Sequence, residues 1–404
     1  MTTTINNEHK KLNVPNLRFP EFEGEWEKCA LENLSTEIGD GIHATPLYDD
    51  NGTYYFVNGN NISEYGITIT PTTQRVTEAE AYRNNANILC SKTILLSING
   101  TIGNVALYKG EPIMLGKSAC YINVSTKVNK HYIFHYLMMP KCQFYFTSEL
   151  TGTTIKNLSL KSVRRTKVSL PNLKEQNRIA QLFDAINERI VTQNKIIEDL
   201  KKLKSAIIDY AIDSLDADFV KFSSLYEMAG EGGTPTTSNV QFYDNGKIPF
   251  IKIDDLKQKY LTENKDFITE LGLQKSSAWL VPTRSILFSN GATIGGITIT
   301  TYPVCTKQGI LGIVPKQNID VEFLYYFMSS SYFKKAVSRI VTEGTMKTAY
   351  LKDINNILCP IPTEEKQQEI AKMPSALNSK IDIEQSILKQ LITQKRHLLR
   401  QMFI

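Results

Sequence analysis

The sequence predicts an α+β protein in which two globular domains are separated by two long antiparallel helices that form a coiled coil, with internal pseudo-twofold symmetry. The first observation is a repeat, since Pro171 and Gln176 recur as Pro362 and Gln367, 191 residues later. The second is that each copy ends in a long polar stretch with apolar residues at steps of three and four, as one face of a helix requires. Solenoid units are about 20–50 residues long, so a period of this length indicates duplicated domains.

The repeat extends through both predicted domains, where short motifs occur twice in the same order. The matching pairs are Ile94–Ser97 with Ile286–Ser289, Thr101–Gly103 with Thr293–Gly295, Lys117–Ala119 with Lys307–Gly309, and Thr151–Thr153 with Glu343–Thr345. In chain order we predict an N-terminal extension (1–25), a first domain (26–170), a central long helix (171–214), a second domain (215–361) and a C-terminal long helix (362–404).

Each domain is expected to contain short strands, punctuated by Gly, Asn and Pro, followed by one helix. That helix is predicted over 130–150 in the first domain and near 321–340 in the second. Aromatic residues crowd the first of these helices, and we expect them in the core rather than on a surface that stacks on bases. They are Tyr132, Phe134, Tyr136, Phe144, Tyr145 and Phe146.

Each long helix carries an apolar stripe whose members lie 191 residues from their counterparts. The stripes are Ile179, Leu182, Ile186, Ile190, Ile197, Leu200, Ile207 and Ala211, and Ile370, Met373, Leu377, Ile381, Leu388, Leu391, Leu398 and Met402. Polar residues interrupt both stripes at matching places, namely Gln193 and Lys204, and Glu384 and Lys395. Matching interruptions favour helices that pack on each other, because a buried polar residue can fix register. The alternative is that each helix packs on its own domain.

For the pairing itself we expect Ile186, Ile190, Ile197 and Leu200 to meet Leu377, Ile381, Leu388 and Leu391. Pro374 lies inside the second helix, where the first copy has Phe183. A proline there removes a backbone donor and clashes with the preceding turn, so a break or kink is expected.

Composition indicates a soluble, intracellular protein of two or three domains. The chain has 404 residues, of which 42% are hydrophobic and 22% charged, as in ordinary globular proteins. No apolar run is long enough for a bilayer, and Met1–Lys11 lacks the apolar core of a signal peptide. The six cysteines are scattered, which is typical of reduced thiols, and we expect the protein in the cytoplasm.

The net charge of +5 is too small to identify a partner, but its distribution is informative. The stretch 150–174 contains six basic residues and, up to Lys174, no acidic one: Lys156, Lys161, Arg164, Arg165, Lys167 and Lys174. Such an excess suits a phosphate backbone. A solvated basic face is the alternative, and the corresponding stretch of the second copy is not similarly basic.

Motifs for catalysis are missing from the sequence. It contains neither a Gly-x-x-x-x-Gly-Lys-Ser/Thr phosphate loop nor the Asp/Asn-Pro-Pro-Tyr/Phe signature of amino-methyltransferases. His131 and His135 have the spacing of zinc ligands but lack the glutamate of His-Glu-x-x-His, so no metal site is expected. Asp254 and Asp255 are better explained by an exposed turn than by a nuclease cluster. These observations favour a binding protein without catalytic residues.

Taken together, these segments resemble the specificity subunits of type I restriction–modification enzymes. The second copy carries the match most clearly, in Gly232–Pro235, Tyr243–Phe250, Ile286–Gly295, Lys307–Gly309 and Glu343–Thr345. Pro362 with Gln367, Ile370 and Ala371 completes it, and the first copy follows the same order. The resemblance covers nearly the whole chain.

The resemblance implies two target-recognition domains that each read one half of a bipartite, asymmetric double-stranded DNA sequence. The coiled coil would set the gap between the half-sites and dock two methyltransferase subunits, which nuclease/translocase subunits would join. No cofactor is expected in this chain. S-adenosylmethionine would belong to the methyltransferase, and ATP and Mg²⁺ to the nuclease/translocase. The sequence departs from the pattern at Pro374 and at Lys366, where the first copy has Glu175.

Side chains that read base edges must stand on loops presented to a groove, while phosphate contacts fix the register. Candidate DNA-binding residues are therefore those in the repeated loops: His43, Thr45, Asn58, Asn60, Lys117, Lys156, Thr234, Thr236, Lys252, Asp254, Lys307 and Lys347. The sequence is also compatible with two other functions. One is a coiled-coil scaffold that joins proteins without reading DNA, and the other is an autonomous DNA-modifying enzyme.

Overall fold

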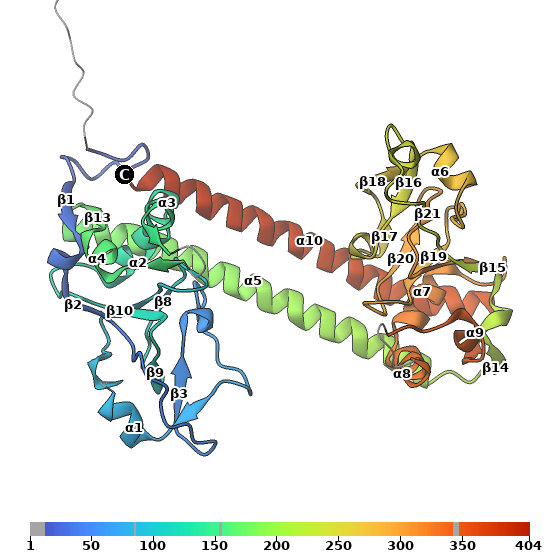
Figure 1. Ribbon diagram of the computed structural model, residues 1–404, viewed down its shortest axis with the longest axis horizontal. Coiled ribbons are helices and arrows are strands. Elements are labelled where there is room, and N and C mark those ends of the chain that lie inside the picture. Colours follow the sequence, from blue (N-terminus) through green and yellow to red (C-terminus); the bar gives the residue numbers. More distant parts are fainter. Residues whose placement is uncertain (1–12, 85, 153–155, 342–346) are drawn as a thin grey trace, which may run out of the picture. The chain divides into compact units, whose positions relative to one another are not determined.

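The computed structural model describes residues 13–84, 86–152, 156–341 and 347–404, and it divides into two compact units. Unit 1 comprises Met1–Asn194 with Ser386–Ile404, and unit 2 comprises Lys195–Gln385. Each unit thus holds one globular domain, the beginning of one long helix and the end of the other (Figure 1). No helix in the described ranges is long and apolar enough to cross a membrane.

An antiparallel sheet of four strands forms the centre of unit 1. In spatial order its strands are β2 (Ser35–Asp40), β10 (Ala119–Val124), β7 (Thr93–Ser97) and β8 (Val105–Leu107). Every side chain of β7 and β10 is buried, because both faces of the sheet are covered. Ile94 and Ile122 face the core of aromatic helices, whereas Leu95 and Tyr121 face a second cluster under a smaller sheet. Burial on both sides explains why these strands are apolar runs without alternation.

Short strand pairs and helices surround this sheet. The strands are β1 (Glu27–Ala30) with β13 (Lys167–Leu170), β6 (Arg75–Val76) with β3 (Tyr54–Val57) and β9 (Ile113–Leu115), β4 (Ile62–Ser63) with β5 (Gly66–Ile67), and β11 (Leu150–Thr151) with β12 (Asn157–Leu158). The helices are α1 (Glu78–Arg83), α2 (Lys130–Met138), α3 (Pro140–Ser148) and α4 (Leu160–Arg165).

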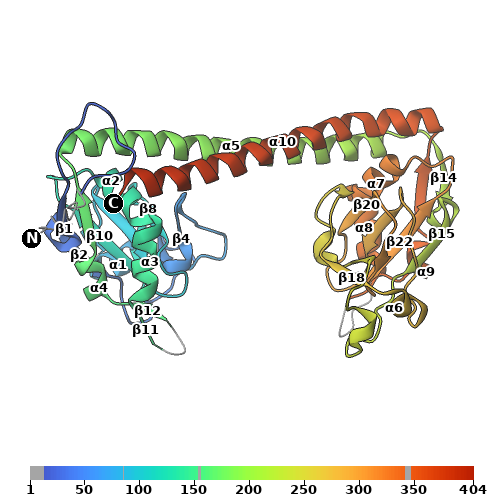
Figure 2. The ribbon, with the colours of Figure 1, turned by 90° about the horizontal axis from the view of Figure 1, so that it is seen from above.

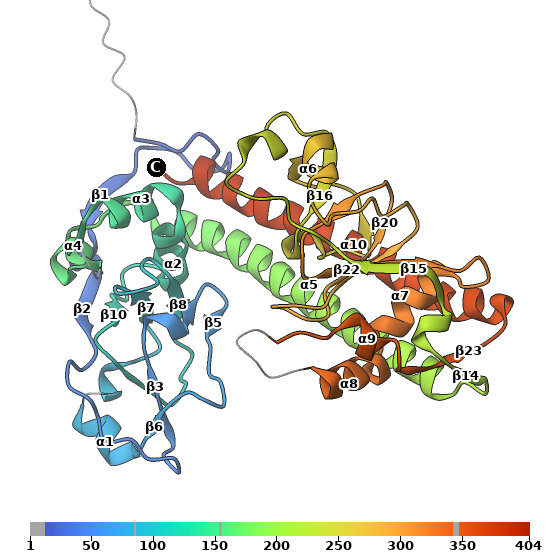
Figure 3. The ribbon, with the colours of Figure 1, turned by 45° about the vertical axis from the view of Figure 1, so that its right-hand side comes forward.

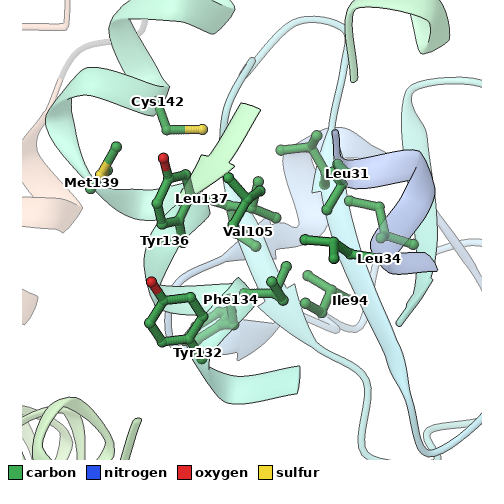
Figure 4. Close-up of a cluster of buried hydrophobic side chains, with 14 of the residues drawn as sticks. Leu31, Leu34, Ile94, Val105, Tyr132, Phe134, Tyr136, Leu137, Met139 and Cys142 are labelled. Atoms are coloured by element: carbon green, nitrogen blue, oxygen red, sulfur yellow. The ribbon is translucent and has the colours of Figure 1, made fainter. Parts of the chain in front are cut away.

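The single helix predicted over 130–150 is wrong, because the structure has two helices there, α2 and α3. Met139 between them is extended, with φ −66° and ψ 147°, and Pro140 begins α3. Proline excludes the residue before it from the helical region, so Pro140 was the overlooked signal. The aromatic side chains of α2 point into the core, with Tyr132 and Tyr136 beside Leu137 and Val105 (Figure 4). Phe144 of α3 is the exception, since it is 73% exposed.

Unit 2 repeats this plan. Its main sheet is β15 (Tyr226–Glu231), β22 (Ile310–Pro315), β19 (Ile286–Ser289), β20 (Ile297–Thr300) and β17 (Tyr260–Leu261). The remaining strands are β14 (Asp218–Lys221) with β23 (Leu358–Ile361), and β18 (Asp266–Ile268) with β16 (Ile248–Ile251) and β21 (Cys305–Thr306). The helices are α6 (Glu270–Gln274), α7 (Val321–Ser329), α8 (Ser331–Ile340) and α9 (Leu351–Ile354). The predicted helix near 321–340 is again two, divided at Ser330.

The repeat holds at the level of strand register. Cys120 of β10 lies opposite Asp40 of β2, and their counterparts Leu311 and Glu231 lie opposite each other, both 191 residues later. Both strand pairs also have an irregularity in the register near the same place, next to Val124 in unit 1 and next to Tyr226 in unit 2. These findings confirm the predicted α+β class built from a duplicated domain.

The long helices are α5 (Leu173–Asp213) and α10 (Glu364–Met402), and within each unit they run antiparallel. In unit 1 the beginning of α5 meets the end of α10, where the Phe183 ring lies 5.5 Å from that of Phe403. The C-terminal end of α10 lies beside α3 in both Figure 1 and Figure 3. In unit 2 the end of α5 meets the beginning of α10, and Lys204 Nζ donates to Asn378 Oδ1 over 2.9 Å.

The polar residues that interrupt the apolar stripes lie on the same buried face as the apolar ones, since Gln193, Glu384 and Lys395 are all buried. Among the predicted pairing residues, Ile190, Ile197, Ile381 and Leu391 are buried, whereas Ile186, Leu200, Leu377 and Leu388 are half-buried. The place of Met373 in the stripe is wrong, because its side chain is 61% exposed. The buried face runs instead through Ala371 and Pro374.

The break expected at Pro374 is also wrong, because α10 continues through this residue. Pro374 is buried at the position that Phe183 occupies in α5. A proline ring holds φ near −65°, which a helix requires, so the helix continues here although it loses one backbone donor and must accommodate the ring against the preceding turn.

One repeated glutamine joins each domain to its long helix. Gln176 near the start of α5 donates from Nε2 to Pro171 O over 2.8 Å and accepts from Asn129 N, ahead of α2, over 2.9 Å. Gln367 makes the same two contacts with Pro362 O (3.0 Å) and Asp320 N (2.8 Å). Asn129 and Asp320 in turn cap α2 and α7. The repeated Pro-to-Gln motif therefore couples the two helices that meet at each junction.

Candidate nucleic-acid interface

Three loops of unit 1 meet at one end of the central sheet. Backbone hydrogen bonds join them, from Ile42 N to Leu115 O and from Gly116 N to Val57 O, each 2.9 Å long. Ser118 Oγ donates to Asn58 Oδ1 and accepts from Gly59 N, also over 2.9 Å each. The loops that carry His43 and Thr45, Asn58 and Asn60, and Lys117 are thus brought together.

A further loop and a hairpin extend this group. Thr101 Oγ1 donates to Gly59 O over 2.8 Å, and Leu158 N donates to Ile98 O over 2.9 Å. The second bond places the hairpin of β11 and β12, which includes Lys156 next to β12, beside the loop after β7. Figure 2 shows β11 and β12 at the end of unit 1 that lies away from α5 and α10. The candidate residues of this unit therefore belong to one connected set of loops.

Unit 2 builds the same set of loops with its own residues. Gly232 N donates to Ile310 O (2.8 Å), Lys307 N to Ile251 O (2.9 Å) and Ala349 N to Asn290 O (2.8 Å). Gln308 N donates to Thr234 Oγ1 over 3.3 Å. The loops of Thr234 and Thr236, Lys252 and Asp254, Lys307, and Lys347 accordingly adjoin one another.

Most of the candidate side chains are exposed, although several also contact other groups of the same domain. The exposed ones are His43, Thr45, Asn60, Lys117, Lys156, Thr236, Asp254, Lys307 and Lys347. Asn58 and Thr234 are half-buried and accept the hydrogen bonds given above. Lys252 Nζ lies 2.7 Å from Asp266 Oδ1. His43 Nε2 also contacts Asp40, at 2.9 Å from Oδ2, although its side chain is 72% exposed.

The turns that follow β3 in unit 1 and β16 in unit 2 are built alike but present different chemistry. Asn61 Oδ1 accepts from Asn58 N over 3.0 Å, and Asp255 Oδ2 accepts from Lys252 N over 2.9 Å. Each bond closes a short 3-10 turn, over Gly59–Asn61 and Ile253–Asp255. At the same place on these turns stand the amide of Asn60 and the carboxylate of Asp254. An amide suits adenine, and a carboxylate accepts from the amino group of cytosine.

The alignment of Lys117 with Lys307 is wrong by one residue. Gly116 N donates to Val57 O and Lys307 N to the equivalent Ile251 O, so Lys307 occupies the place of Gly116. A Cβ atom on Gly116 would lie 2.3 Å from Asn58 Oδ1, which explains the glycine. A one-residue shift at a turn is invisible to motif matching because both segments read Lys followed by a small or polar residue.

The basic stretch 156–174 is only partly available to a ligand. Arg164 is engaged inside the domain, since its Nη2 donates to Ile38 O over 2.7 Å. Lys156, Lys161, Arg165, Lys167 and Lys174 are exposed. The counterpart α9 contains Lys352 and Asp353, whose charges cancel, so a net positive charge on this element is a feature of unit 1 alone.

Two cavities adjoin the candidate loops. One, of about 480 Å³ in unit 2, is lined by Lys252, Asp254, Asp255 and Asp266 among other polar residues. The other, of about 270 Å³ in unit 1, is lined by Asp40, Arg83 and Tyr121. Burial, with a hydrogen bond to Glu37, raises the pKa of Tyr121 to about 12, so its hydroxyl stays protonated and donates to Glu37 Oε1 over 3.0 Å.

The two histidines with zinc-like spacing bind a carboxylate of the protein itself. His131 Nδ1 and His135 Nε2 each lie 2.8 Å from an oxygen of Asp184 on α5. Burial lowers the pKa of His135 despite its contact with Asp184, which keeps this imidazole neutral. Over the part of the chain that the structure describes, no group of three or more His, Cys, Asp and Glu side chains is arranged to hold a metal ion.

Sequence reasoning missed the residues that hold the loops together. Ser118 and Thr101 each bridge two loops, although neither stood out in composition or spacing. Thr101 lies in the repeated Thr-Ile-Gly motif, so its repetition was the available signal. Ser118 has no hydroxyl counterpart in the second copy and gave no signal.

Comparison with known proteins agrees with this architecture. The family model described as the type I restriction modification DNA specificity domain matches twice, over residues 23–202 and 216–393. The putative type I restriction enzyme MjaX specificity subunit of Methanocaldococcus jannaschii is 23% identical, over 97% of this chain and 96% of its own length. The EcoBI specificity subunit of Escherichia coli is 26% identical, over 71% of this chain and 66% of its own length.

A solved structure shows the same fold. The type I restriction–modification S subunit from M. genitalium aligns with a TM-score of 0.59 at 18% identity, over 97% of this chain and 99% of that one. The two matches of the family model cover well over half of the chain, and their boundaries follow the two copies of the repeat. The chain therefore belongs to the family of type I restriction–modification DNA specificity subunits, and within such an enzyme it is the non-catalytic component that recognises DNA.

Proposed function

We propose that the chain recognises a bipartite, asymmetric sequence in double-stranded DNA, one half with each unit. The observation that supports this most strongly is that one loop scaffold occurs twice with different side chains, as at Asn60 and Asp254. A duplicated reader with identical loops would favour a repeated sequence. Two readers with unlike loops favour two different half-sites.

Within each unit, exposed polar side chains would read bases and exposed lysines would bind phosphates. For base edges we propose His43, Thr45 and Asn60 in unit 1, and Thr236 and Asp254 in unit 2. Lys117, Lys156, Lys307 and Lys347 would neutralise phosphates, which positions the protein without selecting a sequence. Asn58, Thr234 and Lys252 would act mainly by holding the reading loops, because each already has a partner inside the domain.

The catalytic functions would reside in partner subunits. We propose that methyltransferase subunits, which carry S-adenosylmethionine, dock on the long helices, and that nuclease/translocase subunits supply ATP and Mg²⁺ chemistry. An exposed apolar row on α5 supports a docking surface, since Ile196, Leu203 and Tyr210 follow one another at steps of seven and are 39%, 49% and 77% exposed. Residues at this step lie on one face of a helix. The complex would act in the cytoplasm, on cellular DNA.

The test is reconstitution with the methyltransferase subunits, followed by mapping of methylated adenines in genomic DNA. The chain alone should transfer no methyl groups, and the complex should methylate one split sequence. Asn60→Ala should relax the sequence at positions of one half-site only. Lys117→Ala should weaken binding at every sequence without changing the preferred bases. Lys127, an exposed lysine before α2, provides the control, because Lys127→Ala should change neither.

Methylation of a single continuous sequence would contradict a bipartite target. A change in both half-sites after Asn60→Ala would contradict independent reading by the two units.

A further inference from the structure

The junction between domain and long helix differs in charge between the two units. In unit 1 the helix supplies the acid, since Asp184 of α5 is held by His131 and His135 of α2. Burial opposes the ionisation of Asp184, but the two imidazoles outweigh it and hold the pKa of this carboxyl well below its ordinary value. The domain thus brings two imidazole rings to a carboxylate on the helix.

The equivalent positions in unit 2, 191 residues later, are Glu322 and Tyr326 of α7 and Ser375 of α10. Here the helix is neutral, and Ser375 Oγ donates to Glu322 Oε2 while it accepts from Tyr326 over 3.1 Å. The charge that balances Glu322 comes from the same domain, since Lys259 Nζ lies 2.7 Å from Glu322 Oε2 and 2.8 Å from Ser375 Oγ. The Lys259 side chain is only 3% exposed.

A second pair of equivalent residues differs in the same manner. Lys395 Nζ of α10 lies 2.5 Å from Glu64 Oε2 of the domain. Its counterpart Lys204 contacts Asn378 of the other helix instead. Asn187, the counterpart of Asn378, has a buried Oδ1 with no hydrogen-bond partner among the described residues. In unit 1 the helix lysine is therefore bound by the domain. In unit 2 the equivalent lysine is bound by the other long helix.

We infer that the charges at these two junctions determine which domain docks on which helix surface, because each surface accepts a domain of matching charge. We call this arrangement the position code. The surface around Asp184 and Lys395 fits a domain that offers imidazole rings from α2 and an acid at residue 64. The surface around Ser375 fits a domain that offers an acid already paired with its own buried lysine. The glutamine contacts of Gln176 and Gln367 are common to both junctions and fix the docking geometry without selecting the domain.

The position code has a physical basis in the cost of leaving a partly buried charge without its partner. A second domain placed on the first helix surface would bring Glu322 against Asp184, so that one Lys259 ammonium would face two carboxylates. A first domain placed on the second surface would bring His131 and the neutral His135 against Ser375, which offers a hydroxyl in place of a carboxylate acceptor. The larger penalty arises at the first surface, because leaving a partly buried charge without its partner is destabilising. This inference concerns the assembly of the chain and does not depend on which DNA sequence is read.

The test is a chain in which residues 26–170 are replaced by a second copy of 217–361. In the native chain, Asp184→Ser should lower the midpoint of thermal unfolding of unit 1. In the exchanged chain the same substitution should raise the midpoint, because it recreates the contact that Ser375 makes with Glu322 and Tyr326 in unit 2. The expected shift in either direction is on the order of 5 °C, given typical couplings between contacting residues. Glu188→Ser, at an exposed acid of the same helix, should leave both chains nearly unchanged.

If the exchanged chain does not fold, His131→Glu in the native chain tests the same contact. Its destabilisation should be relieved by adding Asp184→Ser and not by adding Glu188→Ser. The inference is overturned if Asp184→Ser lowers the midpoint in every one of these backgrounds. It is overturned equally if the exchanged chain is as stable as the native chain without any change at Asp184.

Discussion

The ion pair between Arg18 and Glu175 should contribute more to the stability of unit 1 than any surface pair in the chain. Arg18 lies ahead of the first domain, and its Nε and Nη2 each contact a carboxylate oxygen of Glu175 at 2.8 Å. The Glu175 side chain is completely buried, and that of Arg18 is 16% exposed. The equivalent of Glu175 in the second copy is Lys366, which forms only an exposed pair with Glu369. The chain thus contains its own control position.

Removing the carboxylate with Glu175→Ala should destabilise unit 1 by about 3 kcal/mol. Breaking a buried pair costs about 3–5 kcal/mol when the remaining charge has no other partner. Arg18 keeps the backbone oxygens of Gly24 and Glu23, at 2.7 and 2.9 Å, so the lower end of that range applies. For a unit of this size, about 3 kcal/mol corresponds to a fall in melting temperature of roughly 6–12 °C. Lys366→Ala, at the exposed counterpart, should cost no more than about 0.5 kcal/mol.

Calorimetry gives the melting temperatures, and hydrogen exchange shows which unit opens first. Faster exchange should appear at the start of α5 and at the end of α10, which share the core with Phe183. Arg18→Ala added to Glu175→Ala should cost little more, because the pair is already broken. If Glu175→Ala lowers the melting temperature no more than Lys366→Ala does, the buried ion pair does not stabilise unit 1 as expected.

Three further predictions concern acid, salt and spacing. Because burial lowers the pKa of His135, the unfolded chain binds protons below pH about 6.5 that the folded chain refuses, so unit 1 should be fully stable above that pH and lose stability below it. Unit 2 contains no histidine, so its stability should not change between pH 7 and 5.5. Hydrogen exchange at both pH values measures the stability of each unit, and an equal loss of stability in the two units would contradict the prediction. Lys156→Ala should reduce the slope of log binding constant against log salt by about 0.9, as loss of one phosphate contact does, and an unchanged slope would exclude that contact. Inserting seven residues into α5 between Glu198 and Lys204, with a matched insertion in α10, adds roughly 10 Å and should lengthen the gap between half-sites by about 3 base pairs; an unchanged gap in an active complex would show that the helices do not set it.

The duplicated domains and the long helices could be predicted because equivalent buried positions in the two copies hold residues of the same type. Gln176 and Gln367 are the best example, since each must bind one carbonyl and one amide at a helix start. The division of one predicted helix at Met139 was missed, although Pro140 required it. The continuity of α10 through Pro374 could not be predicted, because a buried position that packs well can hold a proline.

The candidate interface was predictable as a set of loops and not as a set of contacts. Exposure separates Asn60 from Asn58 and Thr236 from Thr234, and the bonds responsible come from Ser118 and Gln308, far away in the sequence. The charge difference at the domain junctions was hidden for the same reason. Nothing in the sequence indicates that His131 and Asp184 are in contact, because the contact forms only where α2 packs against α5.

The central claim is that each unit independently reads one half of a bipartite DNA sequence. The most direct measurement replaces residues 26–170 with the corresponding domain of another family member and maps methylated adenines made by the reconstituted complex. We expect one half-site to change to that of the donor, while the other half-site and the gap between them stay the same. A change in both half-sites, or in neither, would contradict it.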